Sequence, residues 1–592
     1  MAAPDVNSLF ASAEAALAAG RLDEARKALN SVLGEVSGHP AVFHLRAMVE
    51  KRSGDFSAAD QAFRTALALL PGDPQINNNY ANLLDELGDS DAALLHYDRA
   101  LSTDPAFADA RFNRALLLQR LDRTEEALRE LDTLLAANPQ SARSHSARGA
   151  ALRRQGRIRE AAAAYDAVLA LSPTHLRALA GRARVALEGG EAGASAHFRR
   201  ALAALPSDPE LLLGLAEALE AEGDPQALPF LEGAVAAHPQ WVEGQERLAE
   251  MRSENGDEGH FARGYPAALA IRPGDRALHY SHWRALAMAS CHAEALDAMA
   301  AARPNLAEDH DMQLMEAVFL SEAGDPARGA DLLSRLGDEP EIALAHARAL
   351  LRLGEAGRAV YRLEQVIAAQ PGNIAAWAHL GLAWRLTGDP RHEWLCGQAG
   401  LHGPIDLALG NDGLARLAEV LRALHRTRSH PIGQSLRNGT QTRGNLLWRS
   451  DPEIVALKDA LTDAIGAYVA RLPPPDSSHP LLRHRNDRFE IGGSWSVRLA
   501  ASGFHIHHIH PQGILSSACY IALPESLGDE TDRAGWLELG ASPAELGLGL
   551  EPIASIEPRP GRLALFPSYL YHGTRPFSAG ERLTVAFDVV AR

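Results

Sequence analysis

Four histidines lie within six positions near the end of this 592-residue chain: His505, His507, His508 and His510. Neutral imidazole is a common protein ligand of divalent transition metals, Fe(II) and Zn(II) among them. This segment is therefore the first place in the chain where metal chemistry is expected.

Two of these histidines are expected to face the same way. The segment Phe504–His510 has the sequence of a strand, in which side chains alternate between two faces. If its even-numbered apolar residues face a core, then His508 and His510 face that core too and can reach one metal ion. His505 and His507 point to the other side, where we expect solvent or a substrate.

His572 is the expected third ligand. It follows the apolar, strand-like segment Arg562–Phe566 and falls within the stretch Pro567–Gly573. If the two strand-like segments belong to one β-barrel, His572 can lie next to His508 and His510. The alternative is a histidine-rich barrel that binds no metal.

Arg582 stands ten positions beyond His572, and Thr584 follows it on the same face of a strand. A guanidinium beside a hydroxyl can hold a carboxylate through a bidentate contact and a further hydrogen bond. The pattern therefore predicts a pocket for an anionic co-substrate next to the metal. The alternative for Arg582 is a surface salt bridge.

These residues belong to a C-terminal region with the pattern of an antiparallel barrel or jelly roll. Its strand-like segments, separated by turns that contain Gly or Pro, are Ser494–Leu499, Phe504–His510, Leu515–Leu523, Trp536–Leu539, Arg562–Phe566 and Leu583–Val589. We expect helices at Leu414–Leu424 and Glu453–Arg471 to pack on the outside of this barrel.

The preceding region repeats with a period of 33 to 34 residues. Prolines recur at that spacing, namely Pro71, Pro105, Pro139, Pro173, Pro206, Pro239 and Pro273. Glycine recurs at the end of the first helix of a repeat, and alanine and an aromatic residue recur in the second helix: Gly54, Gly88, Gly156; Ala59, Ala93, Ala127, Ala161; Phe63, Tyr97, Tyr165. Such a period is typical of helix–turn–helix repeats.

This pattern resembles the tetratricopeptide repeat. Trp377, Leu380, Gly381 and Trp384 match the signature of its first helix, with a tryptophan where tyrosine is usual. We expect about eleven repeats over residues 6–390, stacked into a superhelix with a concave groove. The resemblance implies that the groove binds a protein or peptide; the alternative is a spacer or an oligomerisation stalk.

The C-terminal motifs resemble the 2-oxoglutarate/Fe(II)-dependent oxygenases that are found fused to tetratricopeptide repeats. The stretches that carry this resemblance are Gln434–Thr442, His508–Tyr520, Gly561–Ser568, His572 and Arg582–Thr584. The resemblance implies a double-stranded β-helix that holds Fe(II), with 2-oxoglutarate as co-substrate and ascorbate as a further candidate cofactor.

The resemblance also implies roles for single residues. In such enzymes 2-oxoglutarate chelates the iron, is converted to succinate, and a substrate carbon is hydroxylated. Arg582 and Thr584 would hold the distal carboxylate of 2-oxoglutarate, and Tyr520 is a weaker candidate for the same pocket. A loop that contacts the substrate, or alternatively a capped turn, is expected at Thr440, Gln441 and Thr442.

One position departs from the family pattern. The usual triad is His-x-Asp/Glu with a distant His, but the residue two positions after His508 is His510. Three arrangements are compatible with the sequence: a three-histidine set, a two-histidine site with His510 outside the ligand set, or a distant carboxylate such as Asp487 or Glu538. Strand alternation favours the first.

Composition argues against several other classes. The formal net charge of −17 disfavours nucleic acids and anionic membranes as partners. No apolar run approaches the 18 residues of a membrane span. The three cysteines, Cys291, Cys396 and Cys519, are far apart and fit a reducing cytoplasm rather than a disulfide framework or a thiolate zinc site.

We therefore expect an all-α tetratricopeptide-repeat solenoid over residues 1–392, a helical linker over 393–425 and a double-stranded β-helix (jelly-roll) domain with flanking helices over 426–592. The leading hypothesis is a cytoplasmic Fe(II)/2-oxoglutarate oxygenase whose repeats recruit a polypeptide substrate. One alternative is a non-catalytic scaffold with a degenerate β-helix cap. Another is a small-molecule dioxygenase without 2-oxoglutarate, against which the Arg582 and Thr584 pair argues.

Overall fold

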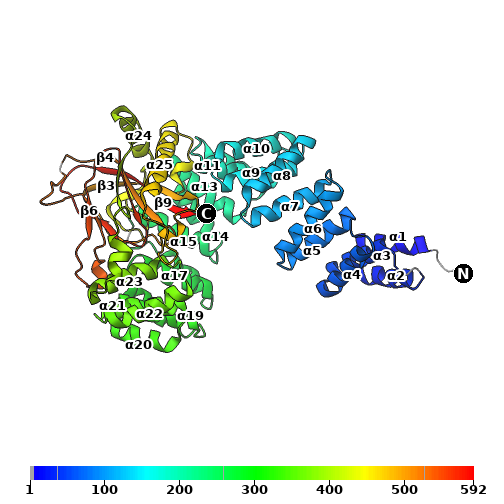
Figure 1. Cartoon of the computed structure of the whole chain (residues 1–592), viewed down its shortest axis with the longest axis horizontal. Coiled ribbons are helices and arrows are strands. Elements are labelled where there is room, and N and C mark those ends of the chain that lie inside the picture. The colour runs from blue at the N-terminus through cyan, green and yellow to red at the C-terminus, as the bar shows by residue number, and fades with distance from the viewer. Residues whose placement is uncertain (1–5, 36–37, 258, 526) are drawn as a thin grey trace. The chain divides into compact units, whose positions relative to one another are not determined.

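The computed structural model describes residues 6–35, 38–257, 259–525 and 527–592. The chain forms two compact units, Met1–Val185 and Ala186–Arg592. The first unit is helical, and the second contains further helices and every strand of the described residues (Figure 1). The predicted fold class, a helical repeat solenoid followed by a jelly-roll domain, is confirmed.

Ten helices lie in the described part of the first unit, and they pack in consecutive pairs. They are α1 (Val6–Ala18), α2 (Leu22–Glu35), α3 (Pro40–Ser53), α4 (Phe56–Leu69), α5 (Pro74–Glu86), α6 (Ser90–Thr103), α7 (Ala108–Arg120), α8 (Thr124–Ala137), α9 (Ala142–Arg154) and α10 (Ile158–Leu171). The next helix, α11 (Leu176–Glu188), runs across the boundary between the units.

The residues that recur along the sequence account for these helices. Pro74 opens α5, and the carboxylate of Asp73 caps the helix by accepting a backbone N–H of its first turn at 2.8 Å. Gly54 follows α3 with a φ of 84°, in the left-handed region that favours glycine. Ala59 and Phe63 of α4 are fully buried, so the small and aromatic positions of the repeat form the contacts between helices.

The second unit begins with twelve more helices in its described residues. They are α12 (Ala194–Ala204), α13 (Pro209–Glu222), α14 (Ala227–Ala237), α15 (Val242–Glu254), α16 (Gly264–Ile271), α17 (Arg276–Met288), α18 (His292–Ala302), α19 (His310–Glu322), α20 (Pro326–Leu336), α21 (Pro340–Arg352), α22 (Ala356–Ala369) and α23 (Ile374–Thr387). The two helices predicted beside the barrel are present as α24 (Asn411–Leu424) and α25 (Pro452–Arg471). Among the described residues, no helix has both the length and the apolar character needed to cross a membrane.

The strands of the described residues form one antiparallel, nearly barrel-like sheet. They are β1 (Gly403–Asp406), β2 (Leu436–Gln441), β3 (Phe489–His508), β4 (Leu515–Ala522), β5 (Leu537–Leu539), β6 (Ala554–Ile556), β7 (Arg562–Pro567), β8 (His572–Thr574) and β9 (Arg582–Ala591). Their order is β1-β7-β4-β9-β3-β8-β5-β6, and β2 pairs with β3.

Strand β3 is the element that assembles the site. The sequence predicted two strands here, Ser494–Leu499 and Phe504–His510, but the structure has one continuous strand. The first part of β3 pairs with β9, and its last residues pair with β8. One strand therefore brings together the elements that carry His572 and Arg582.

The range 393–425, expected as a helical linker, also contributes to the sheet. It contains a π-helical turn, Glu393–Gly397, and helix α24. It also contains β1, which pairs with β7 along its whole length.

The last repeat helices and the sheet share one hydrophobic core. Trp377 and Leu380 of α23 belong to the same cluster of buried residues as Leu539 of β5 and Tyr569. Arg385 of α23 also donates a hydrogen bond to a backbone carbonyl just after β5 at 2.7 Å. Within the second unit, repeats and sheet therefore pack as one body.

Candidate metal centre and anion pocket

A β-bulge near the end of β3 determines which histidines face the pocket. His505 lies opposite Thr574, and His508 lies opposite His572. Three residue steps along β3 thus oppose two along β8, and the extra residue reverses the alternation of side chains. His505 and His508 therefore both line the pocket, although alternation alone predicted that they face opposite ways.

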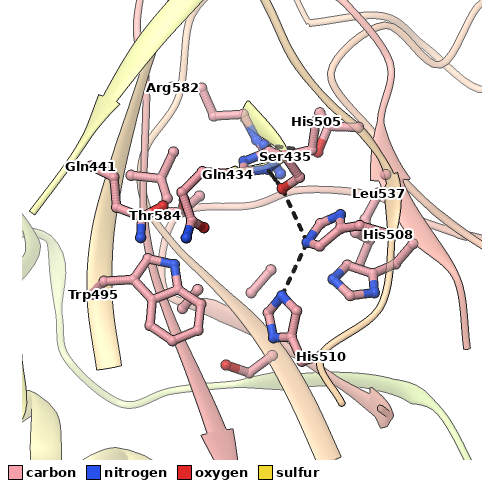
Figure 2. Close-up of a pocket in the computed structure, with 17 residues that line it drawn as sticks. Gln434, Ser435, Gln441, Trp495, His505, His508, His510, Leu537, Arg582 and Thr584 are labelled. Atoms are coloured by element: carbon pink, nitrogen blue, oxygen red, sulfur yellow. Dashed lines mark hydrogen bonds between the residues drawn. The ribbon is translucent and has the colours of Figure 1, made fainter. Parts of the chain in front are cut away.

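His508, His510 and His572 lie together, with one ring nitrogen of each within 4.8 Å of the others. The Nε2 atoms of His508 and His510 are 3.0 Å apart (Figure 2). The ring centroids of His508 and His572 are 4.2 Å apart. Two nitrogens that each lie about 2.1 Å from one ion, at a right angle, are ~3.0 Å apart. The spacing of His508 and His510 fits two ligands of a single ion.

The second ring nitrogen of each histidine is fixed by a hydrogen bond. Nδ1 of His508 donates to the carbonyl oxygen two residues earlier at 2.9 Å, and Nδ1 of His572 makes the equivalent bond at 3.1 Å. Nδ1 of His510 donates to Oδ1 of Asp588 at 2.5 Å. With the proton on each Nδ1, each Nε2 presents a lone pair to the common centre, as in metal sites whose ligands are oriented by outer partners.

Burial keeps two of these imidazoles, those of His508 and His572, neutral. It lowers the pKa of His508 to about 3 and lowers the pKa of His572 well below its ordinary value. Because histidine binds metal only in its neutral form, His508 and His572 need no deprotonation to bind an ion at neutral pH.

The two carboxylates considered as ligands are engaged elsewhere. Glu538 is ion-paired with Arg575, and its Oε2 atom lies 3.4 Å from Nε2 of His507. Asp487 accepts a hydrogen bond from Nδ1 of His484 at 2.8 Å. The structure thus places His507 beside Glu538, apart from the three-histidine group.

Asp588, on β9, is the carboxylate that the sequence did not reveal. Besides His510, it accepts a hydrogen bond from the Ser516 hydroxyl at 3.3 Å. A signal was present in the sequence, because Asp588 has the same strand parity as Arg582 and Thr584. That parity places its side chain on the pocket side of β9.

Arg582 brings a positive charge into the same pocket. Its side chain is 2% exposed, and Nη1 donates to the Thr574 hydroxyl at 3.1 Å. In the part of the chain that the structure describes, Nε of Arg582 has no hydrogen-bond partner and no carboxylate forms an ion pair with the guanidinium. Burial lowers the pKa of Arg582. Because an uncompensated buried charge is costly, an anion bound here would stabilise the site.

Tyr520 and Thr584 lie beside this guanidinium. The centre of the Arg582 guanidinium is 5.1 Å from the centroid of the Tyr520 ring, and Tyr520 lies opposite Thr584 in the pairing of β4 with β9. The Tyr520 hydroxyl is buried beside the Arg582 guanidinium and makes no other side-chain hydrogen bond among the described residues. Burial raises its pKa, so the hydroxyl keeps its proton and can donate to an anion.

The stretch expected at the substrate side contributes one residue to the pocket. Gln441 lines it (Figure 2). The Thr440 hydroxyl is instead hydrogen-bonded to Nδ1 of His425 at 2.8 Å. The Thr442 hydroxyl accepts the backbone N–H of Ser496 at 2.9 Å. The two threonines anchor β2 to its neighbours, and Gln441 between them lies on the pocket side.

Among the other residues that line the pocket and were not predicted as site residues are Gln434, Ser435 and Trp495. The Ser435 hydroxyl lies 3.0 Å from Nδ1 of His505 and 3.1 Å from Nε2 of His508. Gln434 and Trp495 lie across the pocket from His508 (Figure 2). Gln434 and Ser435 begin the stretch that carried part of the family resemblance, whereas nothing in the sequence distinguished Trp495.

Several solved structures resemble the chain. The crystal structure of PilW, described as a widely conserved type IV pilus biogenesis factor, is 21% identical, and the match covers 35% of this chain and 96% of that one with a TM-score of 0.33. A tetratricopeptide repeat protein from Parabacteroides merdae is 21% identical, with 39% and 93% covered and a TM-score of 0.32. Pseudomonas aeruginosa PilF is 18% identical, with 35% and 94% covered and a TM-score of 0.32. No curated protein matches the chain.

Two protein-family models match the chain. Residues 493–588 match the model described as "Putative 2OG-Fe(II) oxygenase". The model described as "Tetratricopeptide repeat" matches residues 44–110, 81–142, 112–175, 146–209 and 344–390. The chain therefore carries tetratricopeptide repeats together with a C-terminal domain that matches the 2OG-Fe(II) oxygenase family.

Proposed function

We propose that this chain is an Fe(II)/2-oxoglutarate-dependent oxygenase that hydroxylates a polypeptide recruited by its repeats. The observation that carries the proposal is the convergence of His508, His510 and His572 next to Arg582, a buried guanidinium with no acidic partner among the described residues. The family match over residues 493–588 supports it independently.

In this proposal His508, His510 and His572 hold Fe(II) through their Nε2 atoms, since imidazole suits this ion. Three neutral ligands leave the two positive charges of the ion uncompensated. The carboxylate of 2-oxoglutarate beside its oxo group and the nearby Asp588 would offset them, and the distal carboxylate of 2-oxoglutarate would offset Arg582. The pocket is then electrically balanced without a carboxylate in the ligand set.

The co-substrate is held by residues of β9 and its neighbours. Arg582 pairs with the distal carboxylate of 2-oxoglutarate, and the hydroxyls of Thr574, Thr584 and Tyr520 donate to it. Because Arg582 is almost completely buried, this ion pair forms away from water and is stronger than a surface pair.

Bound Fe(II) and 2-oxoglutarate supply the oxidising chemistry: O2 and 2-oxoglutarate are consumed, succinate and CO2 form, and a C–H bond of the substrate gains a hydroxyl group. The chain's own residues prepare the site for it. Asp588 keeps the proton of His510 on Nδ1, and the apolar side chains of Val497 and Leu537 restrict water in the pocket.

A polypeptide substrate is supported by the repeats, because stacked tetratricopeptide repeats generally mediate protein–protein interactions. The helices α12, α13 and α14 border a hollow lined largely by apolar side chains, Leu202, Leu212, Leu215, Leu219 and Phe230 among them. Such a hollow suits the side chains of a bound peptide.

A cytoplasmic location is part of the same proposal. Cys291, Cys396 and Cys519 are all free thiols. Unpaired cysteines, two of them buried, support a reducing compartment.

The test combines metal analysis with succinate release. Purified full-length protein is assayed with Fe(II), 2-oxoglutarate and a cell lysate, and hydroxylated peptides are sought by mass spectrometry. We expect bound iron, succinate release that the lysate stimulates, and a polypeptide that gains one oxygen. His572→Ala should abolish all three. Absence of bound iron and of succinate in the unaltered protein would instead favour a non-catalytic scaffold.

A further inference from the structure

One wall of the pocket comes from a segment that a repeat helix holds at both ends. Residues 428–443 supply Gln434, Ser435 and Gln441 to the pocket. Glu254, the last residue of α15, contacts both ends of this segment, and Glu250 of the same helix also pairs with Arg443 at 3.1 Å.

The backbone of Glu254 binds the start of the segment. Its carbonyl oxygen accepts hydrogen bonds from the backbone N–H groups of Arg428 at 2.9 Å and Ser429 at 3.0 Å. Carbonyls in the last turn of a helix have no partner within the helix, so this one is available to an outside donor.

The side chain of Glu254 binds the end of the segment. Nη2 of Arg443 lies 2.5 Å from its Oε1 atom, and Nε of Arg443 lies 3.0 Å from its Oε2 atom. This is the bidentate arrangement in which arginine binds a carboxylate most strongly. The Glu254 side chain is 1% exposed, and Arg247 of α15 lies 3.6 Å from Oε2 on the other side.

Between these two anchors the segment also rests on α17. Ile432 packs against the buried cluster that contains Trp283. Gly433 has a φ of 78°, and a Cβ atom on it would lie 2.9 Å from the end of the Met288 side chain. The chain therefore passes close to α17 immediately before Gln434.

We propose that Glu254 is a positioning residue for the substrate side of the oxygenase pocket, acting through the segment 428–443. This inference rests on the proposed function. It adds that a helix of the repeat array positions Gln434, Ser435 and Gln441 on the substrate side of the pocket. The metal ligands are placed by β3, β8 and β9, and the segment contacts one of them, His508, through the Ser435 hydroxyl.

Hydrogen–deuterium exchange of the full-length protein tests the clamp without requiring turnover. In Glu254→Gln, peptides from residues 429–435 should exchange about tenfold faster or more, because a buried ion pair loses one partner. Arg443→Met should have the same effect, and Arg443→Lys should restore part of the protection. If Glu254→Gln fails to fold, the exchange of Arg443→Met tests the clamp by itself. The Arg443 side chain is 33% exposed, so its replacement disturbs the core less than replacement of Glu254.

Glu50→Gln is the matched control. Glu50 is a buried glutamate on a repeat helix, paired with Arg26 and near Arg46, and it belongs to the first unit. The Glu50→Gln substitution should leave the hydrogen exchange of residues 429–435 unchanged. Equal effects of Glu50→Gln and Glu254→Gln would mean general loosening of the repeats and would overturn the proposal.

Succinate release provides the functional readout. In Glu254→Gln, release from 2-oxoglutarate without lysate should stay within about twofold of the unaltered protein, while stimulation by lysate should fall about tenfold. If Glu254→Gln and Arg443→Met both leave hydrogen exchange and lysate stimulation unchanged, the pairing of β2 with β3 alone is sufficient to position residues 428–443. That result would overturn the proposal. Failure of the proposed function would look different, because the unaltered protein itself would release no succinate.

Discussion

Nδ1 of His510 lies 2.5 Å from Oδ1 of Asp588, so a carboxylate orients the histidine that occupies the position where the oxygenase family usually has an acidic ligand. A negative charge is thus present next to the site, on a residue that contacts His510 and not on a residue at the ligand position itself. This arrangement favours the three-histidine set among the alternatives that the sequence left open.

Replacing Asp588 should weaken the metal site. In Asp588→Asn we expect metal affinity to fall by ~10–100-fold, because the outer partner no longer holds the His510 tautomer or raises its basicity. Titration with Co(II) or Fe(II) measures this. Asp487→Asn is the control, since it removes another Asp–His hydrogen bond away from the pocket. Equal affinities in Asp588→Asn and the unaltered protein would show that Asp588 has no part in the site.

Removing His572 should abolish metal occupancy. His572→Ala takes away one of three converging nitrogens and leaves a pair that lies on one segment. His507→Ala, which alters a histidine paired with Glu538, should bind metal normally. Metal stoichiometry by elemental analysis distinguishes them, and iron retained in His572→Ala would refute the assigned ligand set.

Replacing Arg582 should affect the co-substrate and spare the metal. In Arg582→Met we expect the Kd of 2-oxoglutarate to rise roughly 100-fold, because a buried charge pair is lost. Metal affinity should remain unchanged. Arg575→Met, which removes the ion pair with Glu538, serves as the control. Equal 2-oxoglutarate affinity in Arg582→Met and the unaltered protein would mean that another residue binds the carboxylate.

The metal-free protein should lose stability as the pH falls from about 6.5 to about 4. Burial lowers the pKa of His379 to about 4 from an ordinary value of 6.5, so the folded state keeps this histidine neutral while the unfolded state takes up a proton. The slope of the unfolding free energy against pH is proportional to the number of protons taken up on unfolding. In His379→Gln this number should be smaller by about one in this pH range. Urea unfolding at several pH values measures it, with the exposed His310→Gln as control. An unchanged slope in His379→Gln would contradict the assigned burial effect.

The helical repeats could be predicted because their signals are local. A turn after α3 needs Gly54, and close packing needs Ala59 and Phe63, whatever the rest of the chain does. The proximity of His508 and His572 could also be predicted, because a small barrel has few strands and His572 follows one of them.

The remaining features depend on register, which one sequence does not specify. The bulge that turns His505 into the pocket appears only once β3 pairs with β8. The bond between His510, just after β3, and Asp588 of β9 depends on the pairing of β3 with β9, which was not predicted. The role of Glu254 depends on how a repeat helix meets the loop before β2.

Anaerobic titration with Fe(II) and then 2-oxoglutarate tests the central claim most directly. We expect one iron per chain and a weak visible absorption band that appears when 2-oxoglutarate chelates that iron. The band should be retained in His507→Ala and lost in His572→Ala. A protein that binds no iron, or one that binds iron but shows no band with saturating 2-oxoglutarate, would contradict it.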